Sequence, residues 1–328
     1  MKALVCPAYG PLENLHVGEL PDPMPGAGEV LIEVRAAGVN FPDVLIVQGK
    51  YQFKPEPPFA PGGEVAGVVR AVGPGVERFK AGDRVLATMI SGGYAELAVA
   101  KEHQVLRLPE GLGDEVASAF ALTYGTSYHA LKDRAALKPG ETLLVLGAAG
   151  GVGLAAVELG VVMGARVIAA ASSDDKLAMT REHGAHETIN YATEDLRARI
   201  KDLTGGKGVD VIYDPVGGDM AETALRSIAW EGRFLVVGFA AGEIPKLPLN
   251  LVLLKGCQVV GVFWGSFAER EPQRNEANLE EMVGWYREGR IRPHIDGTYP
   301  LEQSIDALRR IAARQVRGKL VITMPGSV

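Results

Sequence analysis

The sequence predicts an α/β protein in which a β-rich portion is joined to a doubly wound parallel sheet. Short apolar runs separated by Gly and Pro fill residues 1–109, as expected of an antiparallel barrel or sandwich. From Glu141 onward, apolar strand-like runs alternate with helix-like segments, which is typical of a parallel sheet covered by helices. The 328 residues are enough for two domains of ordinary size.

Strands in the N-terminal portion are predicted from its apolar runs: Leu4–Cys6, Glu29–Gly38, Glu64–Gly73, Asp83–Met89 and Tyr94–Ala100. The spacing of apolar residues then predicts a helix over Leu112–Lys138, which Pro139 and Gly140 end.

The second portion contains longer apolar runs of the kind found in strands buried on both faces. These predicted strands are Thr142–Gly147, Arg166–Ala171, Val209–Asp214, Gly232–Phe239 and Cys257–Gly265. Helices at Glu276–Glu288 and Leu301–Ala313 then precede a last strand, Lys319–Met324. We expect this tail to return to the β-rich domain, so the predicted domains are residues 1–120 with 266–328, and residues 121–265.

Composition narrows the class of protein. The net charge of −6 argues against a nucleic-acid partner, which calls for a basic face. Cys6 and Cys257 lie too far apart in sequence for a disulfide framework or a four-ligand zinc site. The longest uncharged stretch, Thr142–Val157, is too short and too rich in glycine to cross a membrane, and we recognise no signal peptide. We therefore expect a cytoplasmic enzyme without membrane insertion.

A glycine-rich segment follows the strand Thr142–Gly147. In a dinucleotide-binding unit such glycines form a tight turn, admit the pyrophosphate to the backbone, and let helix and strand pack closely. A tight turn between buried elements is the alternative, but the preceding strand, the following helix and the next strand favour a dinucleotide site. The predicted cofactor-binding residues here are Gly150, Gly151, Val152 and Gly153.

The end of the next strand distinguishes NAD from NADP. A carboxylate there binds the ribose hydroxyl of NAD, but this strand ends at Ala171. Ser172, Ser173 and Lys176 follow and could bind a 2′-phosphate, so we expect NADP(H). The rival interpretation takes Asp174 or Asp175 as the ribose-binding acid.

Several motifs, spread over nearly the whole chain, match those of one protein family and stand in the same order as in that family. They are GVNFPDVLIVQGKY (Gly38–Tyr51), PFAPGGEVAGVV (Pro58–Val69), LTYGTSYHAL (Leu122–Leu131), GAAGGVGLAAVELG (Gly147–Gly160), INY (Ile189–Tyr191), YDPVGGD (Tyr213–Asp219) and RGKLVIT (Arg317–Thr323). With them the chain resembles the zinc-free, ζ-crystallin-like quinone oxidoreductases of the medium-chain dehydrogenase/reductase superfamily. The resemblance implies a GroES-like catalytic domain, a Rossmann domain, and a homodimer formed through the last Rossmann strand, around Cys257–Phe263.

Comparison with zinc alcohol dehydrogenases implies that the metal is absent. Those relatives have a cysteine at the position of Asn40 and a histidine at that of Gly63, and a cysteine-rich lobe after Ala87 is missing here. The six scattered histidines do not rebuild a zinc site. Without a Lewis acid, hydride transfer to a quinone or an α,β-unsaturated carbonyl is expected rather than alcohol oxidation.

The resemblance also assigns residue roles. Asn40, Asp43 and Tyr51 are the expected catalytic residues at the nicotinamide and substrate end, although Tyr51 could instead be a packed loop aromatic. Further cofactor contacts are expected from a set that the resemblance carries over: Asn40, Thr123, Ser172, Ser173, Lys176, Tyr191, Phe239, Ala240, Phe263, Trp264 and Lys319. Apolar packing is the alternative for Phe263 and Trp264, and a surface charge is the alternative for Lys319.

Two further functions remain open at this level. An enoyl-thioester reductase, acting on acryloyl-CoA or a related substrate, would need basic residues such as Lys50, Lys54 and Arg70 near the substrate. A nucleotide-binding protein without turnover, either crystallin-like or RNA-binding, is the non-enzymatic alternative. The acidic net charge and the residues expected at the hydride site count against it.

Overall fold

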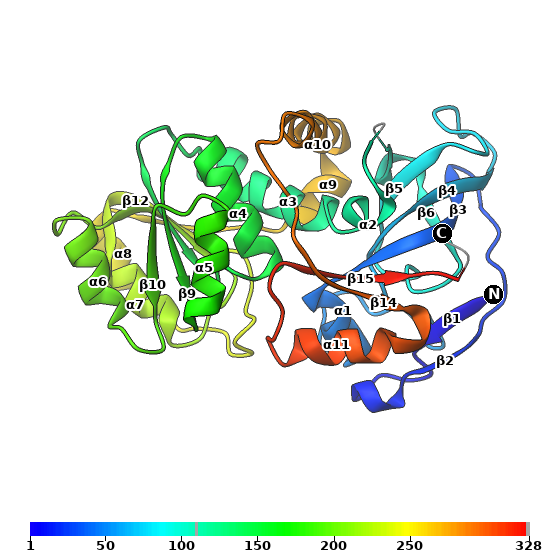
Figure 1. The fold of residues 1–328 in the computed structure, drawn as a ribbon, viewed down its shortest axis with the longest axis horizontal. Coiled ribbons are helices and arrows are strands. Elements are labelled where there is room, and N and C mark those ends of the chain that lie inside the picture. The colour runs from blue at the N-terminus through cyan, green and yellow to red at the C-terminus, as the bar shows by residue number, and fades with distance from the viewer. Residues whose placement is uncertain (109–110, 326–328) are drawn as a thin grey trace. The chain divides into compact units, whose positions relative to one another are not determined.

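The chain forms two compact units, which Figure 1 shows in a computed structural model describing residues 1–108 and 111–325. The first unit comprises Met1–Leu122 and Pro293–Val328, and the second comprises Thr123–Arg292. The chain therefore leaves the first unit and returns to it at the end, as predicted for the tail. The predicted boundaries differ from these units at two places: residues 121–122 belong to the first unit, and residues 266–292 belong to the second.

Helices α9 (Trp264–Arg270) and α10 (Pro272–Arg287) account for the second difference. The ring of Phe267 in α9 stacks on that of His129, with centroids 3.9 Å apart. Asn278 in α10 donates a hydrogen bond to Asp133 at 2.9 Å. Both helices are thus bound to residues 129–134 of the second unit, which their own amphipathic pattern could not reveal.

A mixed sheet forms the body of the first unit, in the strand order β14-β15-β3-β4-β5-β7, with β6 also paired to β3. The last strand, β15, pairs antiparallel with β3, and the two lie side by side in Figure 1. The elements of this unit are β1 (Lys2–Val5), β2 (His16–Glu19), β3 (Glu29–Val39), α1 (Phe41–Val47), β4 (Glu64–Val72), β5 (Arg84–Thr88), β6 (Leu97–Lys101), β7 (Val105–Arg107), α2 (Asp114–Ala117), β14 (Ile295–Pro300), α11 (Ser304–Ala312) and β15 (Lys319–Thr323).

A parallel sheet forms the body of the second unit, in the order β10-β9-β8-β11-β12-β13. Its elements are α3 (Ala121–Tyr128), β8 (Thr142–Leu146), α4 (Gly151–Val162), β9 (Arg166–Ala171), α5 (Asp174–Glu182), β10 (Glu187–Asn190), α6 (Leu196–Leu203), β11 (Val209–Asp214), α7 (Met220–Arg226), β12 (Ile228–Val236), α8 (Leu249–Lys255) and β13 (Gln258–Gly261). The predicted long helix over Leu112–Lys138 is divided into α2, α3 and a π-helical segment, His129–Arg134.

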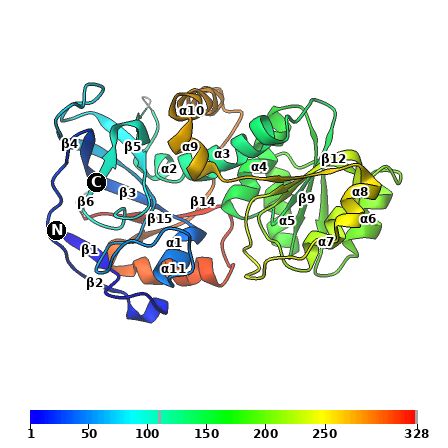
Figure 2. The same ribbon diagram turned by 180° about the vertical axis from the view of Figure 1, so that it is seen from behind.

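The order of these strands creates a topological switch point. From β8 the chain proceeds to β9 and β10 in one direction, and it then proceeds from β11 to β12 and β13 in the other. Helices α4 and α5 contact β8, β9 and β10, while α7 and α8 contact β11 and β12, as Figure 2 shows from behind. Ligands of doubly wound sheets bind at the carboxyl ends of the strands beside the switch point, which here lies between β8 and β11. The predicted α/β fold class is confirmed.

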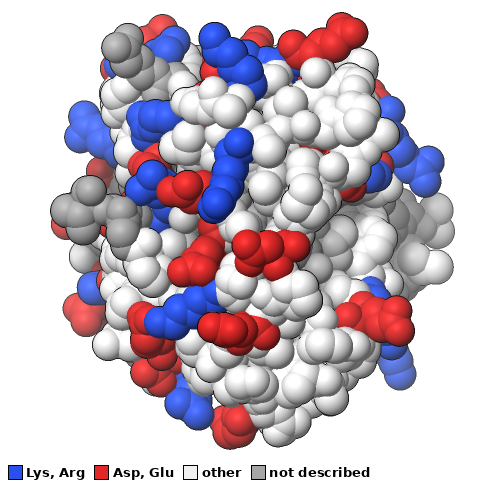
Figure 3. Space-filling view, turned by 90° about the vertical axis from the view of Figure 1, so that its right-hand side faces the viewer, with Lys and Arg blue, Asp and Glu red and all other residues white. Residues whose placement is uncertain are grey.

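Two surface properties bear on function. No helix in residues 1–108 and 111–325 combines the length and hydropathy that a membrane span needs. On the face that Figure 3 shows, acidic and basic side chains are intermixed, without a continuous basic field.

Candidate functional site

The glycine-rich loop lies at the switch point, between β8 and α4. Gly147 has a φ of +57°, which favours glycine. A Cβ on Gly153 would lie 2.3 Å from the carbonyl oxygen of Gly147, so only glycine lets the helix start this close to the strand. The first N–H groups of α4, those of Gly151, Val152 and Gly153, have no acceptor within the helix, so this helix N-terminus could bind an anion.

Loops from the neighbouring strands meet this glycine-rich loop. A Cβ on Gly147 would lie 2.8 Å from a methyl group of Val216, which follows β11. The segment after β12 joins the same edge, because Ala240 donates its backbone N–H to the carbonyl of Pro215 at 3.0 Å. Phe239 lies close to Gly217. The structure therefore brings Phe239 and Ala240 to the edge that carries Gly150–Gly153, through the loop after β11.

Three of the residues expected around a 2′-phosphate follow β9, the next strand of the sheet, and the fourth, Tyr191, follows β10. Lys176, in the first turn of α5, donates to the hydroxyl of Ser172 at 3.5 Å. Ser173 is the N-cap of that helix. Tyr191 donates its backbone N–H to the carbonyl of Ala171 at the end of β9. These four residues thus lie near the end of β9.

Asp174, the alternative ribose-binding residue, has a hydrogen-bond partner within the protein. Asp174 accepts a hydrogen bond from the side-chain amide of Asn190 at 2.8 Å. A carboxylate engaged in this way is less available to a ribose hydroxyl. Asp174 also stands at the N-terminus of α5, where the helix dipole favours an acid irrespective of any cofactor.

A second group of predicted residues lies in the first unit, where β15 pairs with β3. The ammonium of Lys319 donates to the carbonyl of Val39 at 3.0 Å, to Oδ1 of Asn40 at 2.6 Å and to Oε2 of Glu64 at 3.4 Å. Lys319, Asn40 and Glu64 are 5%, 4% and 0% exposed. Burial lowers the pKa of Lys319 and raises that of Glu64, and the attraction between the two charges opposes both effects. Because Lys319 is buried, it is not the surface charge that was the alternative interpretation of this residue.

Asp43 extends this buried polar cluster. Its Oδ2 accepts hydrogen bonds from the backbone N–H of Asn40 at 2.8 Å and from the hydroxyl of Tyr94 at 2.5 Å. Burial raises the pKa of Asp43 to about 6, although both hydrogen bonds and the Lys319 ammonium lower it. Burial also raises the pKa of Tyr51, and the negative charge of Asp43 raises it further.

The cluster does not have the donor set of a zinc site. An asparagine and a glycine stand at the positions of the cysteine and histidine ligands of zinc alcohol dehydrogenases, and neither is a usual zinc ligand. The remaining carboxylate, Glu64, already faces the Lys319 ammonium. Within residues 1–108 and 111–325, no group of three or more His, Cys, Asp or Glu side chains could hold a metal ion. These residues do not fit zinc.

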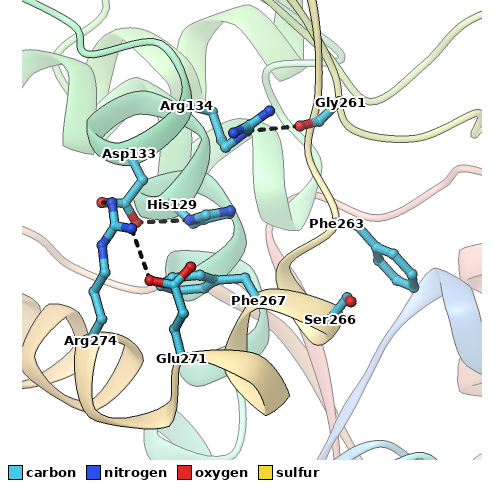
Figure 4. A pocket seen from close by; sticks show the side chains of 9 residues that line it. All are labelled: His129, Asp133, Arg134, Gly261, Phe263, Ser266, Phe267, Glu271 and Arg274. Atoms are coloured by element: carbon cyan, nitrogen blue, oxygen red, sulfur yellow. Dashed lines mark hydrogen bonds and ion pairs between the residues drawn. The ribbon is translucent and has the colours of Figure 1, made fainter.

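The remaining predicted cofactor residues lie elsewhere in the second unit. Thr123 is buried in α3, and the indole ring of Trp264 packs against Gly125 of the same helix. Phe263 is partly exposed and lines a pocket of about 280 Å³ (Figure 4). The side chains that line this pocket include a hydrogen-bonded pair, His129 and Asp133, with 2.8 Å between the bonded atoms.

Sequence reasoning did not identify Glu64 and Tyr94 as site residues. Glu64 begins a strand after two glycines, and a carboxylate ahead of an apolar run indicates a strand end as readily as a buried charge. Tyr94 belongs to an apolar run and resembles an ordinary core residue. Only the packing of β4 and of the segment before β6 against α1 brings both to Asp43.

Comparison with known proteins agrees with the fold. A family model described as an alcohol dehydrogenase GroES-like domain matches residues 26–110, and one described as a zinc-binding dehydrogenase matches residues 151–282. A quinone oxidoreductase-like protein 2 homolog of Nematostella vectensis is 41% identical over 300 residues, which cover 90% of this chain and 82% of the relative. Quinone oxidoreductase of Homo sapiens is 35% identical over 329 residues, which cover 99% of this chain and 98% of the relative.

Solved structures of other oxidoreductases also share this fold. Mycobacterial Rv1454c complexed with NADPH is similar with a TM-score of 0.93 and 31% identity, covering 98% of this chain and 100% of that one. CurK enoyl reductase is similar with a TM-score of 0.89 and 28% identity, covering 99% of each chain. The chain therefore belongs to the ζ-crystallin-like quinone oxidoreductase family of the medium-chain dehydrogenase/reductase superfamily, and it is an oxidoreductase.

Proposed function

We propose that this oxidoreductase uses NADPH to reduce a quinone or another electron-poor α,β-unsaturated carbonyl, without a metal ion. The observation that carries the cofactor assignment is the gathering of Ser172, Ser173 and Lys176 at the end of β9, beside the glycine-rich loop at the switch point. Backbone N–H groups at the start of α4 suit the pyrophosphate, and the serine hydroxyls and the ammonium suit a 2′-phosphate. The NADPH complex of mycobacterial Rv1454c supports the same cofactor.

The first unit supplies the residues for the reaction end of this proposal. When bound, NADPH provides a hydride, and the acceptor must also gain a proton. Tyr51 is the candidate donor, because burial and the charge of Asp43 raise the pKa of its phenol and keep it protonated. Asn40 presents a side-chain amide whose orientation is held by buried charges. The protein's main contribution is to position these groups against an acceptor that is already electron-poor.

The proposal is tested by NADPH oxidation with several acceptors in parallel: 1,4-benzoquinone, 9,10-phenanthrenequinone, crotonyl-CoA and acryloyl-CoA. We expect turnover with a quinone, with NADPH preferred over NADH, and no loss of rate after treatment with a strong chelator. Tight NADPH binding without turnover of any acceptor would contradict the proposed reaction. Stoichiometric zinc in the purified protein would contradict the metal-free mechanism.

An enoyl-thioester reductase is the second candidate for the same site. The similarity to CurK enoyl reductase over 99% of each chain favours it. The hydride and proton chemistry is unchanged, since an enoyl thioester is also an α,β-unsaturated carbonyl compound. A kcat/KM for crotonyl-CoA or acryloyl-CoA well above that for both quinones would identify this alternative.

We also propose that the protein is a homodimer in which β13 pairs with β13 of a second copy. Within the described residues β13 is an edge strand, and Val259 on it is exposed. Beside it, α8 exposes Leu253 and Leu254, and Trp230 packs against Gly256 at the junction of α8 and β13. A second copy related by a twofold axis would pair the open strand edge and cover these apolar side chains together.

A reducing compartment such as the cytoplasm is the proposed location. Both cysteines, Cys6 and Cys257, are buried free thiols. Proteins of oxidising compartments more often pair such cysteines. Fractionation of cells that express the full-length protein would test this proposal.

A further inference from the structure

The hydrogen bonds of Lys319 all stay inside the first unit and indicate what this residue does there. An ammonium group has three N–H donors, and the structure provides an acceptor for each: the Val39 carbonyl, Oδ1 of Asn40 and Oε2 of Glu64. Lysine is almost never buried unless it is paired, and here its partner Glu64 is completely buried. Because its donors are directed at the protein, Lys319 can influence the reaction through the groups that it holds and through its positive charge.

The group held most closely is the side-chain amide of Asn40. Its Oδ1 accepts from Lys319, while its Nδ2 donates to the carbonyl of Gly38 at 3.2 Å and to Oε2 of Glu64 at 3.3 Å. A flipped amide would place its NH₂ group against the ammonium and its oxygen against the carboxylate. The two buried charges and the Gly38 carbonyl therefore select one of the two amide orientations.

The same contacts reach the start of α1. The backbone N–H of Asn40 donates to Asp43, and the backbone N–H of Asp43 donates to the carbonyl of Asn40, so the residue that Lys319 holds is also the N-cap of this helix. Asp43 in turn accepts from Tyr94, and its charge acts on Tyr51. The charged and titratable groups that face Asp43 are thus Lys319, Glu64, Tyr94 and Tyr51, from β15, β4, the segment before β6 and the segment after α1.

We propose that Lys319 is a positioning residue of this enzyme: a buried cation that, together with Glu64, sets the orientation of the Asn40 amide and the charge balance at the start of α1. The proposal rests on the proposed function, in which Asn40, Asp43 and Tyr51 serve the reaction end. Lys319 itself is not expected to touch NADPH or the acceptor.

The test compares three variants that separate charge from amide orientation. Lys319→Met removes the cation and its hydrogen bond to Asn40 while keeping a long side chain. The double variant Lys319→Met with Glu64→Gln removes both buried charges. Lys201→Met, on the exposed side of α6, is the matched control.

The double variant also changes the contacts that orient the Asn40 amide. The backbone N–H of Leu122 donates to Oε1 of Glu64 at 2.8 Å. After Glu64→Gln, the oxygen of the introduced amide must accept this N–H, because its NH₂ group cannot. That NH₂ group then faces the NH₂ group of Asn40 and opposes the native orientation of its amide, which only the Gly38 carbonyl still favours.

We expect Lys319→Met to lower both the unfolding temperature and kcat, and the double variant to recover the unfolding temperature but not kcat. A misplaced reactive group commonly costs about 10- to 100-fold in rate, so a loss of that size in kcat is expected with little change in the Kd of NADPH. The pH profile of kcat should also shift to higher pH in Lys319→Met, because the lost ammonium had favoured ionised Asp43. Lys201→Met should match the wild type in all of these measurements.

Two outcomes would overturn the assignment. Wild-type kcat and an unshifted pH profile in Lys319→Met would show that the cation does not position the site. Recovery of kcat together with stability in the double variant would show that Lys319 only neutralises Glu64. Absence of turnover in the wild type with every acceptor would instead contradict the proposed function, and the side-chain ¹⁵N resonance of Asn40 in wild type and double variant would then still report whether the amide flips.

Discussion

The carboxyl group of Asp43 combines complete burial with a hydroxyl donor and a backbone donor on one oxygen. Burial disfavours its charged form, and this exceeds the stabilisation that Tyr94, Asn40 and Lys319 provide, so its pKa rises from 3.8 to about 6. A carboxyl group of this kind changes charge in the range where many enzymes operate. It links the stability of the first unit to pH.

Replacing Asp43 by Asn should remove a pH-dependent part of the stability. Because the folded protein binds this proton more tightly than the unfolded chain does, the contribution is fully present below pH 3.8 and is lost as the pH rises through about 6. This rise in the pKa of Asp43 corresponds to roughly 3 kcal/mol of the free energy of unfolding. We expect the free energy of unfolding of the wild type, relative to Asp43→Asn, to fall between about pH 4 and 7 in urea titrations. The exposed-site variant Asp202→Asn should show no such trend, and a constant difference between wild type and Asp43→Asn would refute this origin.

Lys176 offers a test of the cofactor preference at a single side chain. Its ammonium lies beside the Ser172 hydroxyl at the end of β9, where a 2′-phosphate is proposed to bind. A hydrogen bond to a charged group contributes about 1.5–3 kcal/mol, so Lys176→Ala should raise the KM for NADPH about tenfold or more and leave kcat unchanged. Steady-state kinetics with NADH should not change, and Lys201→Ala should not affect either cofactor. An equal loss with NADH would indicate that Lys176 does not contact a phosphate.

At the scale of elements, the junction of β8 and α4 combines a packing requirement with a binding requirement. Gly153 meets the first, because any Cβ would overlap the Gly147 carbonyl oxygen. Gly150 differs, since its φ is −78° and a Cβ there would lie 3.5 Å from the nearest atom, an ordinary contact. The two glycines therefore serve separable roles.

Gly153→Ala and Gly150→Ala should consequently behave differently. Forcing a methyl group into the packed junction costs about 1–3 kcal/mol, so Gly153→Ala should lower the free energy of unfolding and weaken NADPH binding. Gly150→Ala should fold as stably as the wild type and lose only NADPH affinity, because its methyl group would project where the pyrophosphate is proposed to bind. Urea unfolding and fluorescence titration with NADPH measure the two effects. Equal destabilisation by both substitutions would contradict this division.

Most of the strands with continuous apolar runs were predictable, and strands of mixed polarity were not. The predicted strands at Glu29–Gly38, Arg166–Ala171 and Val209–Asp214 match β3, β9 and β11 closely. β10 and β14 were missed, because ETIN and IDGTYP mix polar with apolar residues and depend on a neighbouring strand for their pairing. The predicted strand Cys257–Gly265 ends at Gly261, since Trp264 begins α9 and packs against Gly125.

For the whole molecule, the proposed dimer predicts a specific sensitivity of assembly. Leu253→Lys with Leu254→Lys would place two charges in the apolar surface beside β13. We expect this variant to sediment as a monomer at micromolar concentration, whereas the wild type sediments as a dimer. Met24→Lys, at an exposed apolar residue of the first unit, is the control and should remain dimeric. A monomeric wild type would contradict the proposed assembly, and a dimeric double variant would place the interface elsewhere.

Local pattern alone determined the fold class, the glycine-rich loop and the group of residues after β9, because strand periodicity and turn glycines are properties of neighbours in sequence. The resemblance located Asn40 and Asp43 but not their partners. Only the tertiary structure decided that Lys319 holds Asn40, 279 residues away, and Glu64, 255 residues away. That contact depends on the antiparallel pairing of β15 with β3, in which Leu320 lies opposite Val39 and so places Lys319 beside Asn40. A charged side chain at the start of a strand can face solvent or the core, and the register of the paired strand determines which of these it does.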